Sequence, residues 1–207
     1  MTRPLIIGLT GPTGAGKSLV ARALLNDPSI RCLDMDALAR VVTEPGHPTL
    51  QTLTEAFSPD ILRADGSLNR QKLASIAFST PEGAQKLNSI THPAIWQETE
   101  RRLAEYAAQS DVKAVLLDAP LLLEAGMERI CHKVIAVVAP PKTRISRIME
   151  RDGITEEQAR LRMQRQQPDA FYTDKADLTV HNTVDADASS AILQQVRECV
   201  ERWCACD

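Results

Sequence analysis

Residues 5–18 read LIIGLTGPTGAGKS. An apolar run leads into a glycine-rich loop, and a helical pattern over residues 18–26 follows the loop. The segment from Gly11 to Ser18 matches G-x-x-x-x-G-K-[ST], the pattern of a loop that wraps a phosphate. Glycines let successive backbone N–H groups turn toward an anion, and the positive end of the following helix dipole adds to the attraction. Strand, loop and helix therefore predict a site for a nucleoside triphosphate, although they do not name a reaction.

The loop supplies the expected contacts to a nucleotide and its metal ion. We expect the nucleotide to be bound by Gly11, Thr13, Gly14, Ala15, Gly16, Lys17, Ser18 and Leu19. Lys17 is expected to reach the β- and γ-phosphates, and the Ser18 hydroxyl is expected to bind Mg²⁺. Asp118 ends the apolar run 115–117, where an acid could hold the same ion through a water. The expected cofactors are ATP and Mg²⁺.

The composition excludes several classes of protein. The chain has 207 residues, of which 43% are hydrophobic and 25% charged, which is close to a soluble globular average and unlike a disordered or collagen-like chain. Its net charge of −3 argues against a general binder of nucleic acid or anionic membranes. The five cysteines include no C-x-x-C pair, so neither a zinc site nor a disulfide framework is indicated. With no signal peptide and no apolar run long enough to span a bilayer, we expect a cytoplasmic protein without membrane or nucleic-acid partners.

Short apolar runs alternate with longer helical stretches along the chain. Strands are expected over residues 5–9, 30–33, 112–117, 133–139 and 178–181. The runs 115–117 and 134–138 show no polar alternation, which is typical of parallel strands covered on both faces. The pattern predicts an α/β fold in three layers, with a five-stranded parallel sheet and a final helix over 188–203.

Two stretches depart from this alternation. Residues 37–111 are mostly helical in pattern, and the helix expected over 82–108 is expected to be interrupted at His92-Pro93. Residues 142–165 hold seven Lys or Arg against four acids, and Arg151-Asp152-Gly153 is expected to divide them into two helices. We therefore expect one phosphate-loop kinase domain, with a core of residues 1–36, 112–140 and 176–207, an acceptor-side insert at about 37–111 and a lid at about 141–167.

Other phosphate-loop proteins carry motifs that are missing here. A switch GTPase should show D-x-x-G and N-K-x-D, and neither occurs; the nearest stretch, residues 174–177, lacks the leading Asn or Thr. A transporter ATPase would carry a segment like L-S-G-G-Q, which is also absent. An insert after the second strand and an arginine-rich stretch near the end favour a small-molecule kinase whose lid closes over the phosphates.

Further motifs occur in a fixed order along the chain. They are Gly8-Leu9-Thr10-Gly11, Asp34-Met35-Asp36 with Ala39-Arg40, Asn69-Arg70 with Leu73, Leu87-Asn88 with Thr91-His92-Pro93, Asp118-Ala119-Pro120-Leu121-Leu122-Leu123-Glu124, Arg151-Asp152-Gly153, Arg162-Met163 with Gln166, and Ala176-Asp177 with Asn182. In this order and spacing, from about residue 5 to residue 182, the chain resembles the dephospho-CoA kinase family. The resemblance implies transfer of the ATP γ-phosphate to the ribose 3′-hydroxyl of dephospho-CoA, the last step of coenzyme A synthesis.

Two carboxylates follow the second expected strand. Open α/β sheets bind ligands beyond the carboxyl ends of their strands, where a carboxylate can accept the proton of an acceptor hydroxyl. Spacing leaves open whether Asp34 or Asp36 is this base. The resemblance favours Asp36, with Asp34 positioning it or helping to organise the metal. For each, the alternative is an N-cap of the next helix.

The resemblance also implies roles for residues outside the loop. Arg151 is the expected catalytic arginine of the lid, and Arg147 and Arg162 are expected to contact the nucleotide. Arg144 is expected on a solvated helix face. Expected acceptor contacts are Arg40, Arg70, His92, Pro120 and Leu121, together with Asp34. Where the family often places a basic lid residue this chain has Tyr172, with Lys175 as a possible substitute.

Three alternatives stay open from the sequence. The acceptor could be another nucleoside or nucleotide, or a tRNA modified by a prenyl transferase, although the latter would need a longer and more basic chain. A non-catalytic nucleotide-responsive module is the third, and it would bind ATP without transferring phosphate. For the favoured activity we expect a small-molecule partner, dephospho-CoA, and a monomer or weak homo-oligomer.

Overall fold

The computed structural model describes residues 3–183 and 186–206, and the chain divides into two compact units. The first unit comprises Met1–Leu33 and Tyr106–Asp207, and the second comprises Asp34–Glu105. Each unit is described by itself. The assignment of a core, an acceptor insert and a lid remains a functional prediction.

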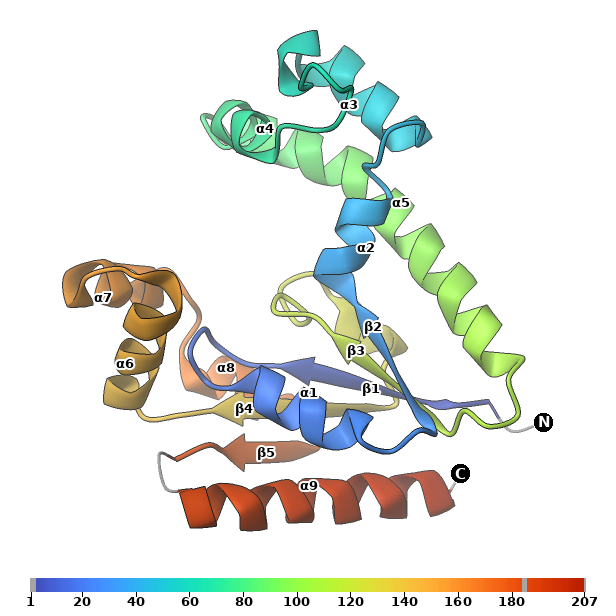
Figure 1. Ribbon diagram of the computed structural model, residues 1–207, viewed down its shortest axis with the longest axis vertical. Coiled ribbons are helices and arrows are strands. Elements are labelled where there is room, and N and C mark those ends of the chain that lie inside the picture. The colour runs from blue at the N-terminus through green and yellow to red at the C-terminus, as the bar shows by residue number, and fades with distance from the viewer. Residues whose placement is uncertain (1–2, 184–185, 207) are drawn as a thin grey trace. The chain divides into compact units, whose positions relative to one another are not determined.

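The first unit is built on a five-stranded sheet in the order β2-β3-β1-β4-β5 (Figure 1). The strands are β1 (Leu5–Thr10), β2 (Ile30–Asp34), β3 (Ala114–Asp118), β4 (Lys133–Val138) and β5 (Leu178–His181). The pairs β1–β3, β1–β4 and β4–β5 are parallel. The predicted α/β fold is confirmed, and no strand end differs from the predicted one by more than two residues.

Buried apolar side chains explain why these runs form central strands. Leu116 and Ile135 have no exposed surface, which fits strands covered on both faces. Helices α1 (Lys17–Leu25) and α9 (Ala186–Cys206) pack against each other beside the sheet (Figure 1). They contribute Val20, Leu24, Val196 and Val200 to one core cluster with the strands. This core holds the carboxyl end of β1, and with it the glycine-rich loop, in place.

A helical hairpin follows β4. It consists of α6 (Pro141–Asp152) and α7 (Glu156–Gln164), and α8 (Asp169–Thr173) comes after it; a short 3-10 helix, η2 (Met127–Ile130), precedes β4. The predicted break is confirmed: Gly153 ends α6 at a φ of 64°, and Thr155 begins α7 with a capping box to Gln158. Ile145, Ile148 and Ala159 form the small core of the hairpin.

The second unit is helical. It contains α2 (Met35–Val41), α3 (Pro48–Phe57), the 3-10 helix η1 (Pro59–Ile61), α4 (Arg70–Ala77) and most of α5 (Pro81–Ala107). Its core is the cluster of Leu50, Leu53, Ile61, Leu68, Leu73 and Ala77. Two residues of α5, Leu87 and Ile90, pack against this cluster. The unit therefore has an apolar core of its own.

Helix α5 runs through Pro93 without a break, so the predicted interruption at His92-Pro93 is wrong. A proline inside a helix removes one backbone hydrogen bond and costs roughly 3 kcal/mol. In a helix of 27 residues the turns on either side keep their own bonds, and the packing of Leu87 and Ile90 holds the preceding turns. The local cost is therefore not enough to end the helix.

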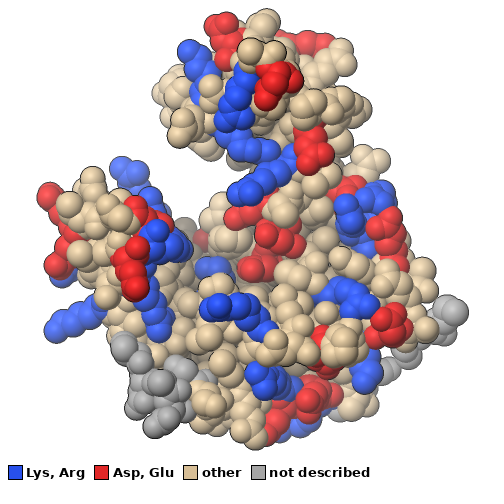
Figure 2. All heavy atoms as spheres, in the orientation of Figure 1, with Lys and Arg blue, Asp and Glu red and all other residues tan. Residues whose placement is uncertain are grey.

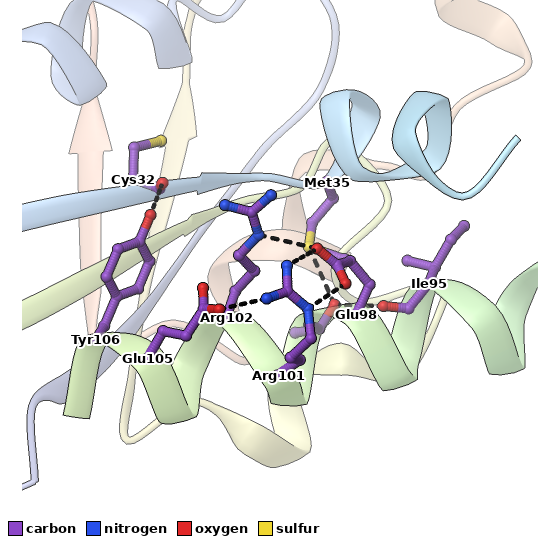
Figure 3. A network of polar contacts seen from close by, with 9 residues as sticks. Cys32, Met35, Ile95, Glu98, Arg101, Arg102, Glu105 and Tyr106 are labelled. Atoms are coloured by element: carbon purple, nitrogen blue, oxygen red, sulfur yellow. Dashed lines mark hydrogen bonds and ion pairs between the residues drawn. The ribbon is translucent and has the colours of Figure 1, made fainter. Parts of the chain in front are cut away.

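The polar side of α5 carries an ion-pair network (Figure 3). Glu98 accepts hydrogen bonds from Arg101 at 2.6 and 2.7 Å and from Arg102 at 2.9 Å. Near it, the Thr99 hydroxyl donates to the Ile95 carbonyl at 2.7 Å.

Among the described helices, none is long and apolar enough to cross a membrane.

Candidate active site

A cavity of about 510 Å³ opens beside the glycine-rich loop of the first unit. It is lined by Gly11, Thr13, Gly14, Gly16, Lys17, Ser18, Asp118, Pro120, Leu121, Arg147, Arg151, Arg162 and Gln166. The structure thus brings together most residues predicted to contact the nucleotide or the metal, with Pro120 and Leu121 beside them. Two predicted contacts lie outside this lining: Ala15 is buried and Leu19 is half-buried.

Close backbone contacts explain two of the loop glycines. Gly11 has a φ of 137°, and a Cβ atom there would lie 2.1 Å from the carbonyl oxygen of Val137. Gly14 has a φ of 76°, and its Cβ would lie 2.7 Å from the carbonyl oxygen of Arg144. No other residue type fits these positions without moving the neighbouring backbone. The loop is therefore shaped by β4 on one side and α6 on the other.

Lys17 lies across the loop at the start of α1. Its ammonium group donates a hydrogen bond to the carbonyl oxygen of Gly11 at 2.6 Å. Burial lowers the pKa of Lys17 below its ordinary value, while the negative charge of Asp118 acts in the opposite direction. Binding to phosphate oxygens would offset the free-energy cost of keeping this ammonium group partly desolvated.

Arg144 fastens α6 to the loop. It is only 5% exposed, so the prediction of a solvated helix face is wrong. Its Nε donates to the carbonyl oxygen of Thr13 at 3.0 Å, and its Nη2 donates to Gln166 Oε1 at 3.1 Å. Gln166 Oε1 also accepts the backbone N–H of Thr13 at 3.0 Å, and Asp169 pairs with Arg144 Nη1 at 3.1 Å. Both backbone polar groups of Thr13 are thus held by residues from α6 and from the segment after α7.

Arg147 and Asn182 hold the next part of the loop. Arg147 Nη1 donates to the carbonyl oxygens of Gly14 at 3.3 Å and Ala15 at 3.2 Å. The Asn182 side chain follows β5; it donates to the Ala15 carbonyl at 2.8 Å and accepts from Arg147 Nη2 at 3.3 Å. Arg147, predicted as a nucleotide contact, lines the cavity and also supports the loop. Sequence reasoning missed the roles of Asn182 and Gln166, although both belong to motifs of the resemblance.

Two exposed arginines of the hairpin face the same cavity. Arg151 pairs with Asp152 at 2.8 Å, and its Nη2 donates to Thr13 Oγ1 at 3.3 Å. Arg162 of α7 also pairs with Asp152. The hydrogen bond from Arg151 is the main cause that lowers the pKa of the Asp152 carboxyl. Basic and acidic side chains are mixed over the hairpin (Figure 2), but Arg147, Arg151 and Arg162 line the cavity, so an anionic ligand meets positive charge there.

Tyr172 and Lys175 stand apart from the described cavity lining. Tyr172 is 1% exposed and donates from its hydroxyl to Glu124 Oε1 at 3.0 Å, and burial raises its pKa to about 12. Lys175 pairs with Glu128 at 3.5 Å and lies 5.2 Å from the centre of the Phe171 ring. In this structure both side chains are engaged in packing and polar contacts of the first unit.

Asp34 and Asp36 belong to the second unit. Asp34 is the last residue of β2, and its Oδ1 accepts the Ala37 backbone N–H at 3.0 Å as the N-cap of α2. Asp34 therefore caps α2, and its predicted contact to the acceptor stays a prediction. Asp36 lies in the first turn of α2 and is exposed.

Of the predicted acceptor contacts Arg40, Arg70 and His92 in the second unit, only Arg70 lines a described cavity. Arg70 lines a cavity of about 200 Å³ and donates to Thr43 Oγ1 at 2.8 Å. Arg40 and His92 are exposed and do not belong to the described lining of that cavity.

Comparisons with known proteins agree over nearly the whole chain. A family model described as dephospho-CoA kinase matches residues 5–188. A dephospho-CoA kinase of Corynebacterium glutamicum is 41% identical, over 93% of this chain and 97% of the relative, and one of Corynebacterium efficiens is 44% identical, over 86% and 88%. A solved Thermus thermophilus protein is 33% identical with a TM-score of 0.77, covering 94% and 97% of the two chains. A dephospho-CoA kinase of Campylobacter jejuni, 24% identical with a TM-score of 0.71 over 95% and 97%, shares the fold.

Proposed function

The chain belongs to the dephospho-CoA kinase family, and we propose that it transfers the γ-phosphoryl group of ATP to the ribose 3′-hydroxyl of dephospho-CoA, forming coenzyme A. One observation carries the proposal beyond family membership. The loop amides, Lys17 and the two hairpin arginines surround one cavity, as phosphoryl transfer from a nucleoside triphosphate requires. The protein is expected to act as a monomer or weak homo-oligomer.

Binding of the triphosphate falls to the first unit. Backbone N–H groups around Gly14 and the amino end of α1 hold the phosphates, and Lys17 exchanges its bond to the Gly11 carbonyl for phosphate oxygens. Arg151 and Arg162 stabilise the negative charge that spreads over the transferring group. Arg144 and Asn182 act on the loop and keep its shape while the ligand binds.

The residues at the cavity fit a bound Mg²⁺ ion. Ser18 supplies a hydroxyl and Asp118 a carboxylate, and the described residues include no cluster of three or more His, Cys, Asp or Glu that could hold a metal alone. Mg²⁺ suits such a sparse oxygen set because it keeps several waters and shares its coordination with substrate phosphates. When bound, the ion neutralises charge on the β- and γ-phosphates.

Asp36 is the proposed base. As the oxygen of the 3′-hydroxyl forms its bond to the γ-phosphorus, the bond from that phosphorus to the bridging oxygen of ADP breaks, and the hydroxyl proton passes to the Asp36 carboxylate. The capping bond of Asp34 supports this choice because it commits one Asp34 oxygen to the backbone of α2. Asp34 then orients the turn that carries Asp36.

A coupled assay for ADP release tests the activity. Dephospho-CoA, adenosine and nucleoside monophosphates are offered as acceptors to the purified protein, and the phosphorylated position is located by ³¹P NMR. We expect turnover with dephospho-CoA and a 3′-phosphate in the product. Faster turnover with a nucleoside monophosphate would assign a different acceptor, and ATP binding without transfer to any acceptor would exclude a kinase.

A further inference from the structure

Three arginines of the second unit lie near one another. Thr43 Oγ1 accepts a hydrogen bond from Arg70 and donates one to the Arg40 carbonyl oxygen, and the charges of Arg40 and Arg63 both act on Arg70. Arg40 lies in the last turn of α2, Arg63 lies between η1 and α4, and Arg70 is the first residue of α4. In Figure 2 a band of basic side chains runs over the second unit. Of these three arginines, none forms an ion pair with a described carboxylate.

Arg63 and Arg70 donate hydrogen bonds to uncharged oxygens, which orient the two side chains but do not neutralise their positive charges. Arg70 Nη2 donates to Thr43 Oγ1 at 2.8 Å, and Arg63 Nη1 donates to the Leu68 carbonyl oxygen at 3.1 Å. Asp65 feels the charge of Arg63, but it accepts hydrogen bonds from the backbone and hydroxyl of Ser67 at 2.9 and 2.6 Å. Both arginines therefore keep donors available for a ligand.

The positive charges of Arg40 and Arg63 repel that of Arg70. Partial desolvation lowers the pKa of Arg70, and the charges of Arg40 and Arg63 lower it further. A group of like charges that form no ion pairs costs free energy in the unliganded protein and is stabilised when a polyanion binds. The cost thus points to an anionic ligand with more than one charge.

An apolar cavity adjoins the same residues. Thr43, Leu68 and Arg70, which take part in the contacts above, line the cavity of about 200 Å³. The rest of its wall is mostly apolar and includes Leu53, Leu73 and Phe78. A ligand that joins a polyanion to an uncharged arm matches this combination.

We propose that Arg63 is a substrate-binding residue that joins Arg40 and Arg70 in holding the diphosphate of dephospho-CoA. The proposal rests on the proposed function, since dephospho-CoA carries a single diphosphate between adenosine and an uncharged arm. It also adds to the family resemblance, because Arg63 lies outside every motif that carries the resemblance. The guanidinium forks suit this task because they bind phosphate oxygens in pairs.

Calorimetric binding of dephospho-CoA tests this role without requiring turnover. Arg63→Gln should weaken the affinity for dephospho-CoA about tenfold, as expected for a lost charged hydrogen bond, and Arg63→Lys should recover part of it. Affinity for ATP should stay unchanged. Raising the salt concentration should weaken binding more in the wild type than in Arg63→Gln, because the wild type has one more charge to screen.

The control is Arg101→Gln, an exposed arginine of the same unit whose partners are the carboxylates of Glu98 and Glu105. It should leave dephospho-CoA affinity at the wild-type value. The proposal is overturned if Arg63→Gln changes this affinity by less than about twofold, or if it weakens ATP binding equally, which would indicate a general structural effect. Failure of the proposed function is a separate result, since it would appear as wild-type protein that does not phosphorylate dephospho-CoA.

Discussion

Thr13 shows at the scale of single residues how the loop is kept in shape. Its backbone N–H donates a hydrogen bond to the Gln166 side chain, and its carbonyl oxygen accepts one from Arg144. Because Arg144 also donates to Gln166, the three residues form a closed set of hydrogen bonds. The loop therefore does not depend on a nucleotide to satisfy these groups.

Replacing Arg144 should loosen this arrangement. In Arg144→Met the Thr13 carbonyl loses a charged donor, and Gln166 loses one of two. Since such a loss typically costs about 1–3 kcal/mol, the KM for ATP should rise about tenfold. Thermal melting identifies any unfolded fraction. Arg160→Met is the matched control, because Arg160 lies exposed on α7 and pairs with Glu156 of the same helix. An unchanged KM for ATP in Arg144→Met would refute the role of Arg144.

Lys17 gives a prediction about pH. Its pKa lies below the ordinary value of 10.5 because of burial, and its charged form is the one that binds phosphate. The affinity for ATP should therefore fall as the pH rises through this lowered pKa, sooner than for an exposed lysine. Titrations of ATP binding between neutral and alkaline pH measure the effect. Lys17→Arg keeps its charge and should lack this alkaline decline; the same decline in that variant would contradict the explanation.

Sequence patterns predict local chemistry better than long-range contacts. Residues 11–18 are contiguous, so one pattern predicts the loop, and the capping alternative for Asp34 depends only on the next few residues. Arg144 and Thr13 are 131 positions apart, and no pattern within either segment indicates that they meet. For the same reason Tyr172 resembles a replaced lid residue in the sequence, whereas its environment is a buried contact with Glu124.

At the scale of elements, strands were easier to predict than the behaviour of α5. Apolar runs such as 134–138 can be buried only inside the sheet, so they form β4 with small errors at its ends. The prediction of a break at His92-Pro93 gives too much weight to one residue in a long helix. Packing against the core of the second unit decides the outcome at Pro93.

The ion pairs on α5 predict an acid-sensitive contribution to stability. Hydrogen bonds from Arg101 and then from Arg102 lower the pKa of Glu98 from 4.5 to about 2 (Figure 3). The folded form thus favours ionised Glu98, and this stabilisation is present above the ordinary pKa and is lost as the pH falls from about 4.5 to about 2.

Glu98→Gln tests this assignment. It should lower the unfolding midpoint by a few degrees at pH 7, a modest effect because both arginines are partly exposed to solvent. The difference from the wild type should vanish near pH 2. Thermal melts followed by circular dichroism across this range measure it, and a difference that persists at pH 2 would mean that the charge of Glu98 is not its cause.

At the scale of the whole molecule, the expected tasks divide between the two units. The donor cavity, with Lys17, Asp118 and the hairpin arginines, belongs to the first unit. The proposed base Asp36 and the arginine group belong to the second. Fold and family were accessible from the sequence because they rest on ordered motifs. The arginine group was only partly accessible, because Arg63 lies outside those motifs and its proximity to Arg70 arises from folding.

The central claim is that ATP bound by the first unit is attacked by an alcohol whose proton goes to Asp36. The most direct test measures turnover and ATP affinity together in Asp36→Asn, with Asp60→Asn, an exposed acid of the same unit, as control. The account predicts unchanged ATP affinity and a loss of turnover of at least about a hundredfold in Asp36→Asn, the usual scale of general-base catalysis, with a normal control. Turnover near the wild-type rate in Asp36→Asn would contradict it.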